Sequence, residues 1–194
     1  MSTIKQVLGE NEKILWEGKP QFLPFIGFAV PFLVTGLLFF LGTLAVGIGN
    51  DNPSAITMGV LFLLVVGVLP FVYNLLVFPH THYVITDKRT IIQRGVIGRD
   101  FVTIEHDQVT SAKVNVGLMD KMFGKNSGSL MIIHAGGATT KNDAAVPDSL
   151  RSITDPYKVY QAFNKISHDV RSDIQFPNAM RPKENKGYET EYKA

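Results

Sequence analysis

The chain has 194 residues, of which 45% are hydrophobic, and its formal net charge is only +2. So small a charge gives no electrostatic argument for nucleic-acid binding. The sequence contains no cysteine, which excludes disulfides, thiolate metal ligands and cysteine nucleophiles. Predictions about function therefore rest on how apolar and basic residues are distributed along the chain.

An N-terminal segment, residues 1–21, precedes two long apolar runs at 22–48 and 56–78. Neither run contains Asp, Glu, Lys or Arg, and each exceeds the ~20 residues that a helix needs to cross the hydrocarbon core of a bilayer. A short polar turn separates the runs. Because backbone polar groups must be paired internally in lipid, this pattern predicts a transmembrane helical hairpin over residues 22–78.

Basic residues beside the runs predict the orientation of the hairpin. Lys13 and Lys19 precede the first run, further Lys and Arg residues follow the second, and the connecting turn has neither. Since Lys and Arg are retained on the cytoplasmic side, we expect both termini in the cytoplasm and the turn outside. The sequence thus predicts a multi-pass protein of the cytoplasmic membrane.

Small and polar residues within the runs are candidate intramembrane contacts, because small residues let helices approach closely. The candidates are Asn74, Ala45, Gly49, Ala55 and Gly59. They favour packing of the two helices on each other, and the alternative is docking of another membrane protein or a second copy of the chain. No ionisable group lines either run, so transport by this chain alone is not expected.

After Pro79 the apolar pattern changes to the alternation of short strands, which predicts a mainly-β domain over residues 80–171. The expected strands are 83–86, 90–94, 100–104, 109–116, 130–134 and 139–141, with a seventh from 144–146 and the approach to Ile153. Residues 118–123 read as a short helical turn closed by Gly124.

A longer helix is expected after the strands. Asp155 is a good N-cap, and Pro156 suits the first helical position. Val159, Phe163 and Ile166 fall on one face of this helix, so it can cap one end of a small barrel or curved sheet. The polar tail, 172–194, is expected to be poorly ordered, or ordered only against a partner.

Motifs in the chain resemble those of a known family. Residues 12–20 read EKILWEGKP, residues 83–95 read YVITDKRTIIQRG, and residues 153–160 read ITDPYKVY. The ordered set resembles prokaryotic membrane proteins in which two transmembrane helices precede a bacterial pleckstrin-homology-like (PH) domain. The resemblance implies a PH-like barrel of about seven antiparallel strands capped by a C-terminal helix, in agreement with the strands expected from the residues themselves.

No motif indicates catalysis. His80 and His82 would share a strand face, but a third ligand at useful spacing is lacking. The sequence has no nucleophile elbow, P-loop or dinucleotide-binding fingerprint. We therefore expect neither an enzyme nor a cofactor or metal site.

Four basic residues are candidate contacts to anionic lipid: Lys88, Arg89, Arg94 and Arg99. Basic side chains close to a cytoplasmic leaflet gain on the order of 1 kcal/mol each from anionic lipid. The plainer interpretation is that they fix topology and solubility, because an anchored domain needs no extra affinity for the membrane.

The leading hypothesis from the sequence is a non-catalytic, membrane-anchored binding or scaffold protein that presents a PH-like domain to a protein partner. The alternatives are a sensor of anionic lipid headgroups, and an accessory subunit of a larger membrane enzyme or transporter complex.

Overall fold

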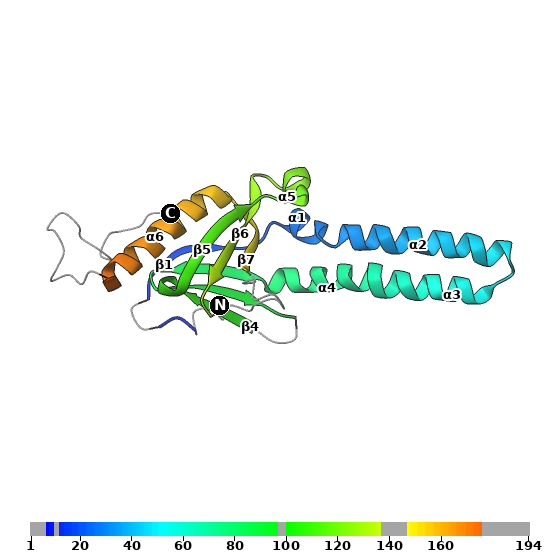
Figure 1. Cartoon of the computed structure of the whole chain (residues 1–194), viewed down its shortest axis with the longest axis horizontal. Helices are drawn as coiled ribbons and strands as arrows, with labels where there is room; N and C mark the ends of the chain where they lie inside the picture. Colours follow the sequence, from blue (N-terminus) through cyan, green and yellow to red (C-terminus); the bar gives the residue numbers. More distant parts are fainter. Residues whose placement is uncertain (1–6, 10–11, 97–99, 137–146, 176–194) are drawn as a thin grey trace.

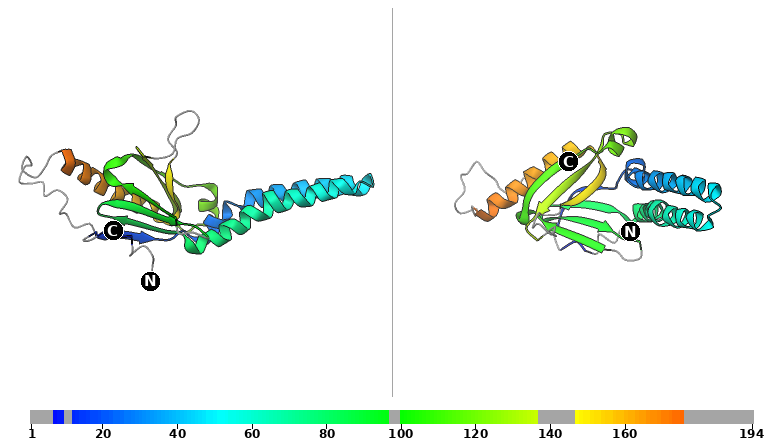
Figure 2. Two further views of the ribbon diagram at one scale, coloured as in Figure 1. Left: turned by 90° about the horizontal axis from the view of Figure 1, so that it is seen from below. Right: turned by 45° about the vertical axis from the view of Figure 1, so that its right-hand side comes forward.

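The computed structural model describes residues 7–9, 12–96, 100–136 and 147–175. It consists of a mainly-β domain and a long apolar helical hairpin that projects from one end of it (Figure 1). Both views of Figure 2 show the same arrangement. The chain enters the domain, leaves it for the hairpin and then returns, so the hairpin is an insertion between the first two strands of the domain.

Two arms make up the hairpin. The outgoing arm consists of α1 (Phe22–Gly27) and α2 (Val30–Gly49). The return arm consists of α3 (Pro53–Phe62), the π-helical η2 (Leu63–Val68), α4 (Leu69–Val77) and the 3₁₀ turn η3 (Phe78–His80). Taken as continuous helices, the arms span Phe22–Gly49 and Pro53–His80, and by length and composition each is long and apolar enough to cross a membrane. The predicted bounds of the two runs lie within three residues of these.

Prolines account for the irregular points in the arms. Pro31 lies in the first turn of α2, just after α1 ends, and Pro70 lies just after the π-helical segment. A proline has no N–H to donate to the carbonyl four residues earlier, so the helical ladder is interrupted at Gly27 and at Val66.

The described part of the domain contains two antiparallel sheets. The first has the order β1-β2-β3-β4, with β1 (Ile14–Gly18), β2 (His82–Thr86), β3 (Arg89–Arg94) and β4 (Asp100–Glu105). The second has the order β5-β6-β7, with β5 (Val109–Asn115), β6 (Ser127–His134) and β7 (Asp148–Thr154). The strands expected to form a PH-like barrel do not close into one, because no strand pairing joins the two sheets among the described residues.

Local structure explains why the barrel stays open. The 3₁₀ turn η4 (His106–Gln108) lies between β4 and β5 and separates the last strand of the first sheet from the first strand of the second. The C-terminal helix α6 (Pro156–Gln175) contacts η4, β5 and β6, so it covers the gap that strand pairing leaves. Phe163, Val159 and Ile166 are buried on the inner face of α6, as the sequence predicted.

Most expected strands are confirmed. β2 to β5 match the predictions within a residue or two, and β6 begins three residues earlier than expected. β7 covers the predicted approach to Ile153, whereas residues 144–146 lie outside the described residues. The predicted strand at 139–141 lies outside the described residues. β1 was not among the expected strands; it lies in the segment 1–21 and pairs with β2.

Candidate binding surfaces

An ion pair between Glu12 and Arg89 ties the N-terminal segment to the turn between β2 and β3. Arg89 donates from Nε to Glu12 Oε1 at 2.9 Å and from Nη2 to Oε2 at 2.8 Å, a bidentate arrangement. The carboxylate also accepts hydrogen bonds from the Thr86 hydroxyl and the Gly9 amide, each at 2.7 Å. The hydrogen bond from Arg89 is the main cause that lowers the pKa of Glu12 from 4.5 to about 2.

Arg89 is therefore used within the fold. Its Nη2 also donates to the Val7 carbonyl at 2.9 Å, and the Glu12 side chain that it pairs with is only 1% exposed. Nε and Nη2 of this guanidinium are therefore used in bonds within the domain.

The structure does not gather the other basic candidates around Arg89. Lys88 is exposed at the β2–β3 turn, whereas Arg94 lies at the opposite end of β3 and donates from Nη2 to the Ser149 carbonyl at 3.0 Å. The two ends of β3 are about 17 Å apart at the usual rise of a strand. Arg99 lies outside the described residues. β2 begins at the base of the hairpin and runs away from it. Lys88 and Arg89 follow β2, so they lie at the end of the sheet far from the hairpin.

Two of the histidines, His106 and His134, have local polar contacts. His106 is buried, its Nε2 lies 3.0 Å from the Thr86 carbonyl, and burial lowers its pKa. His134 Nε2 lies 3.0 Å from Asp148 Oδ2. Over the described ranges, no group of three His, Cys, Asp or Glu side chains is placed to hold a metal ion.

Glycines bring the arms of the hairpin into close contact. Gly36 faces Gly67 so closely that a Cβ on Gly36 would lie 3.2 Å from the Gly67 Cα. Gly59, a predicted contact residue, is buried against Thr43 of the outgoing arm.

The other intramembrane candidates do not join the arms. Ala45 and Gly49 are exposed, and a Cβ on Gly49 would have open space around it. Ala55 is half-buried. Asn74 donates from Nδ2 to the Pro70 carbonyl of its own helix at 2.9 Å, so its amide is bonded without a partner chain.

Gln21 fixes the start of the outgoing arm to the domain. The backbone N–H of Gln21 donates to the Ser152 carbonyl at 2.7 Å. Its side chain donates to Thr154 Oγ1 at 3.0 Å and to the Lys125 carbonyl at 2.9 Å, and accepts from the Lys125 amide at 3.0 Å. Nearby, the Arg151 guanidinium lies 4.7 Å from the centre of the Phe28 ring, a cation–π contact.

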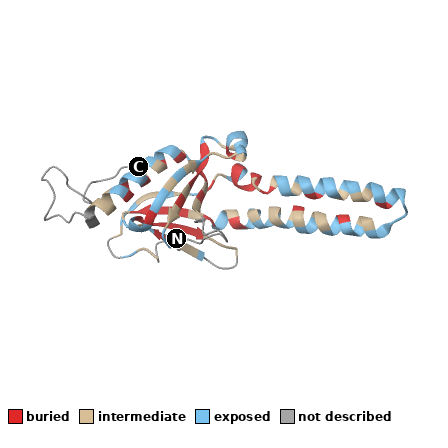
Figure 3. Ribbon diagram, viewed as in Figure 1, coloured by how far each residue is buried: buried red, intermediate tan, exposed pale blue. Residues whose placement is uncertain are grey.

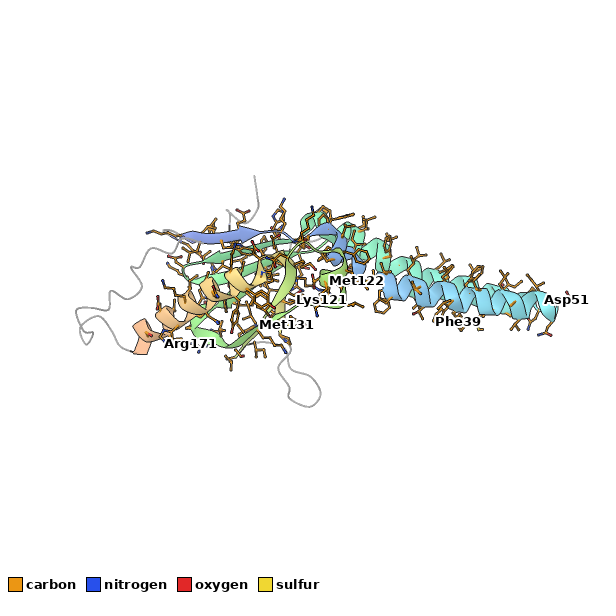
Figure 4. The ribbon with its side chains drawn as sticks, turned by 90° about the horizontal axis from the view of Figure 1, so that it is seen from above. Phe39, Asp51, Lys121, Met122, Met131 and Arg171 are labelled. Carbon is orange, nitrogen blue, oxygen red and sulfur yellow. The ribbon has the colours of Figure 1, made fainter. Side chains whose placement is uncertain are left out.

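The short helix α5 (Leu118–Phe123) packs beside α1 at this junction. Figure 4 places Lys121 and Met122 beside the point where the hairpin meets the domain. An apolar pocket of about 280 Å³ lies between the two arms and α5 and is lined by Phe22, Leu23, Ile26, Gly27, Val30, Phe71, Leu75 and Phe123. The sequence predicted only a short helical turn at 118–123, although four of its six residues are large and apolar and could have indicated a contact surface.

Over the described residues, two antiparallel sheets followed by a C-terminal helix fit a PH-like fold. Residues 29–164 match the family model described as Bacterial PH domain, and the chain belongs to that family.

A similar solved structure is the crystal structure of a DUF1696 family protein with a pleckstrin-homology domain from Shewanella loihica PV-4. It is 20% identical in sequence over 45% of this chain and 70% of that chain, with a TM-score of 0.32. No curated protein matches the chain.

The Glu12 ion pair predicts a pH-dependent stability. Lowering the Glu12 pKa from 4.5 to about 2 corresponds to about 3 kcal/mol of folding free energy. Because the folded pKa is the lower one, this contribution is complete above about pH 4.5 and is lost as the pH falls toward 2. We expect Glu12→Gln to lower the free energy of unfolding by about 3 kcal/mol at pH 7, and the difference from wild type to shrink in acid.

Urea unfolding of the detergent-solubilised protein measures this effect through the fluorescence of Trp16, the only tryptophan, which packs against the core. Glu17→Gln, an exposed change on β1, is the control and should stay within about 0.5 kcal/mol of wild type. A Glu12→Gln penalty that stays constant down to pH 2 would contradict the assignment.

The close approach at Gly36 predicts that a larger residue there separates the arms. We expect Gly36→Leu to destabilise the hairpin by about 1–3 kcal/mol, because its side chain would meet the Gly67 backbone. Gly42→Leu is the matched control on the same helix, since a Cβ there meets nothing within 4 Å. The stability of the two variants is compared by adding SDS to the protein in mild-detergent micelles and following the loss of helix by far-UV circular dichroism. Equal behaviour of the two variants would show that the arms do not pack through Gly36.

Proposed function

We propose that this chain is a non-catalytic, membrane-anchored binding or scaffold protein: the hairpin spans the cytoplasmic membrane, and the PH-like domain is offered to a protein partner in the cytoplasm. The exposure of the hairpin carries the proposal. Only 28% and 11% of the most apolar windows of the two arms are buried (Figure 3). A core helix of a soluble protein would be mostly buried, and so much apolar surface in water would be costly.

The dimensions and the hydrogen bonding of the arms support the same proposal. The 20 residues of α2 extend about 30 Å, which equals the thickness of a hydrocarbon core. The hydroxyls of Thr35, Thr43 and Thr57 donate to carbonyls of their own helices, as the amide of Asn74 does. These polar side chains therefore need no water, as lipid requires.

The end of the first sheet far from the hairpin supports a protein-binding role. The backbone N–H of His106 donates to the Lys88 carbonyl at 3.2 Å, so the β2–β3 turn and η4 form one surface, here called the distal surface. Lys88, Glu105 and Asp107 are exposed on it and carry both signs of charge. The ion pair of Glu12 and Arg89 beneath the turn pre-organises this surface, which reduces the entropy lost on binding.

Neither alternative gains comparable support. A sensor of anionic headgroups would need Lys88, Arg89, Arg94 and Arg99 near the membrane, yet Lys88 and Arg89 are at the far end of the sheet, and Arg89 and Arg94 bond within the domain. An accessory subunit would bind its partner through the exposed faces of the arms rather than through the distal surface.

The orientation can be tested with single cysteines, because the natural chain has none. We expect Ser54→Cys, at the exposed tip of the hairpin, to react with an impermeant thiol reagent in intact cells. Lys88→Cys, on the distal surface, should react only after the cells are lysed. The reverse pattern would place the domain outside, and equal reaction of both sites in intact cells would contradict a spanning hairpin.

The partner can be tested by photo-crosslinking of the full chain in native membranes. A photoreactive residue in place of Lys88 should give a protein adduct of discrete mass, and one in place of Ser54 should not. Adducts from Leu38, which is 64% exposed in the middle of α2, without any from position 88 would favour the accessory subunit instead. Purification in mild detergent without any stoichiometric partner, together with no adduct at position 88, would overturn the scaffold proposal.

A further inference from the structure

We infer that α5 is an interfacial anchor: its exposed apolar side chains insert into the headgroup–acyl boundary of the bilayer that the hairpin crosses, and so fix the orientation of the domain on the membrane. This inference rests on the proposed membrane-spanning role of the hairpin. It assigns a lipid-contacting surface to the domain itself.

The exposure of α5 is unusual for this domain. Leu118, Met122 and Phe123 are 66%, 62% and 46% exposed. Among the described residues outside the hairpin, the only other large hydrophobic side chains classed as exposed are Ile14 and Tyr157, which lie on other elements. α5 thus concentrates apolar surface that the rest of the domain buries.

The fold holds α5 in this exposed position. The buried carboxylate of Asp120 accepts hydrogen bonds from the Ser127 hydroxyl at 2.8 Å and from the Gly117 amide at 3.3 Å. Gly124 ends the helix, and a Cβ there would lie 2.6 Å from the Asp120 carbonyl oxygen, so a larger residue does not fit. The side chain of Asp120 is buried and hydrogen-bonded, whereas Leu118, Met122 and Phe123 are exposed.

The position of α5 matches the expected edge of the bilayer. Its Met119 lies against Gly27 of α1, with a Cβ on Gly27 3.3 Å away. Because α2 alone extends about 30 Å, α1 and its neighbour α5 fall at the boundary of the hydrocarbon core. On the return arm, Tyr73 lies about 30 Å along the helix from Pro53 and is 60% exposed, as suits an interfacial aromatic.

The apolar surface of α5 is continuous with that of the arms, which favours the bilayer as the partner that covers it. The apolar pocket between α1, α4 and Phe123 joins the lipid-facing surface of the arms to α5 without a polar break. Lys121 on α5 and Lys125 just after it are exposed and can reach anionic headgroups. Interfacial helices of this kind bury their apolar face about 5–10 Å below the headgroup boundary.

Depth-dependent fluorescence quenching tests the inference on the full chain in vesicles of phosphatidylcholine and phosphatidylglycerol. An environment-sensitive dye is attached to Met122→Cys, with Leu118→Cys as a second site in case one variant folds poorly. Lys88→Cys, on the distal surface, is the water-exposed control. Phe39→Cys, midway along α2 in Figure 4, reports separately on whether the hairpin spans the bilayer.

We expect blue-shifted emission at positions 118 and 122, with several-fold stronger quenching by a shallow doxyl-lipid than at position 88. Position 39 should be quenched best by a deep doxyl-lipid. Water-like emission at 118 and 122 with deep quenching at 39 would overturn the anchor while leaving the spanning hairpin intact. Blue-shifted emission at 118 and 122 without lipid quenching would mean that protein covers α5, which also overturns it. Failure of deep quenching at 39 would instead reject the proposed function.

Discussion

The antiparallel pairing of β1 with β2 is the constraint on which the rest of the structure depends. Gly18 lies opposite Tyr83, so the two ends of the insertion at residues 19–81 are held side by side. An insertion between neighbouring antiparallel strands must go out and come back over equal distances, and each arm is 28 residues long. The Glu12 ion pair secures the other end of the same strand pair. The sheet therefore sets both the geometry of the hairpin and its attachment.

This constraint also joins the two sequence motifs that flank the hairpin in this chain. Glu12 belongs to the motif before the hairpin, and Thr86 and Arg89 belong to the motif after it. In the fold, the hydroxyl of Thr86 and the guanidinium of Arg89 both donate to the carboxylate of Glu12. In this chain the two motifs form one structural unit that the hairpin divides, and this unit holds β1 and β2 together.

The parts of the fold that local pattern determines could be predicted from the sequence. Composition alone located both arms, and alternation located β2 to β5, because each signal lies within the element itself. β1 was missed because Ile14, Leu15 and Trp16 are a short run whose partner strand lies beyond the hairpin. The open barrel was missed for a similar reason: strand count does not reveal whether the two sheets pair at their edges.

The candidate site was harder to predict, since it depends on which charges are already paired. Lys88, Arg89 and Arg94 are close in sequence, but the extended backbone of β3 separates its ends, and Glu12 is remote from all three in the chain. Counting basic residues cannot distinguish a guanidinium bonded to Glu12 from an exposed ammonium such as that of Lys88. The exposure of α5 could not be predicted for a similar reason. The sequence of a short apolar turn does not reveal whether its side chains are buried or exposed.

Together, the β1–β2 pair, the Gln21 contacts and the packing of α1 on α5 attach the hairpin to the domain at several points. A domain attached in this way cannot turn freely about a linker, so the face that it presents is set by its fold. Arg171, near the end of α6, lies at the opposite end of the molecule from Asp51 at the hairpin tip (Figure 4). The distal surface lies on the side away from the hairpin, and in the proposed orientation it is the surface that a partner in the cytoplasm would meet first.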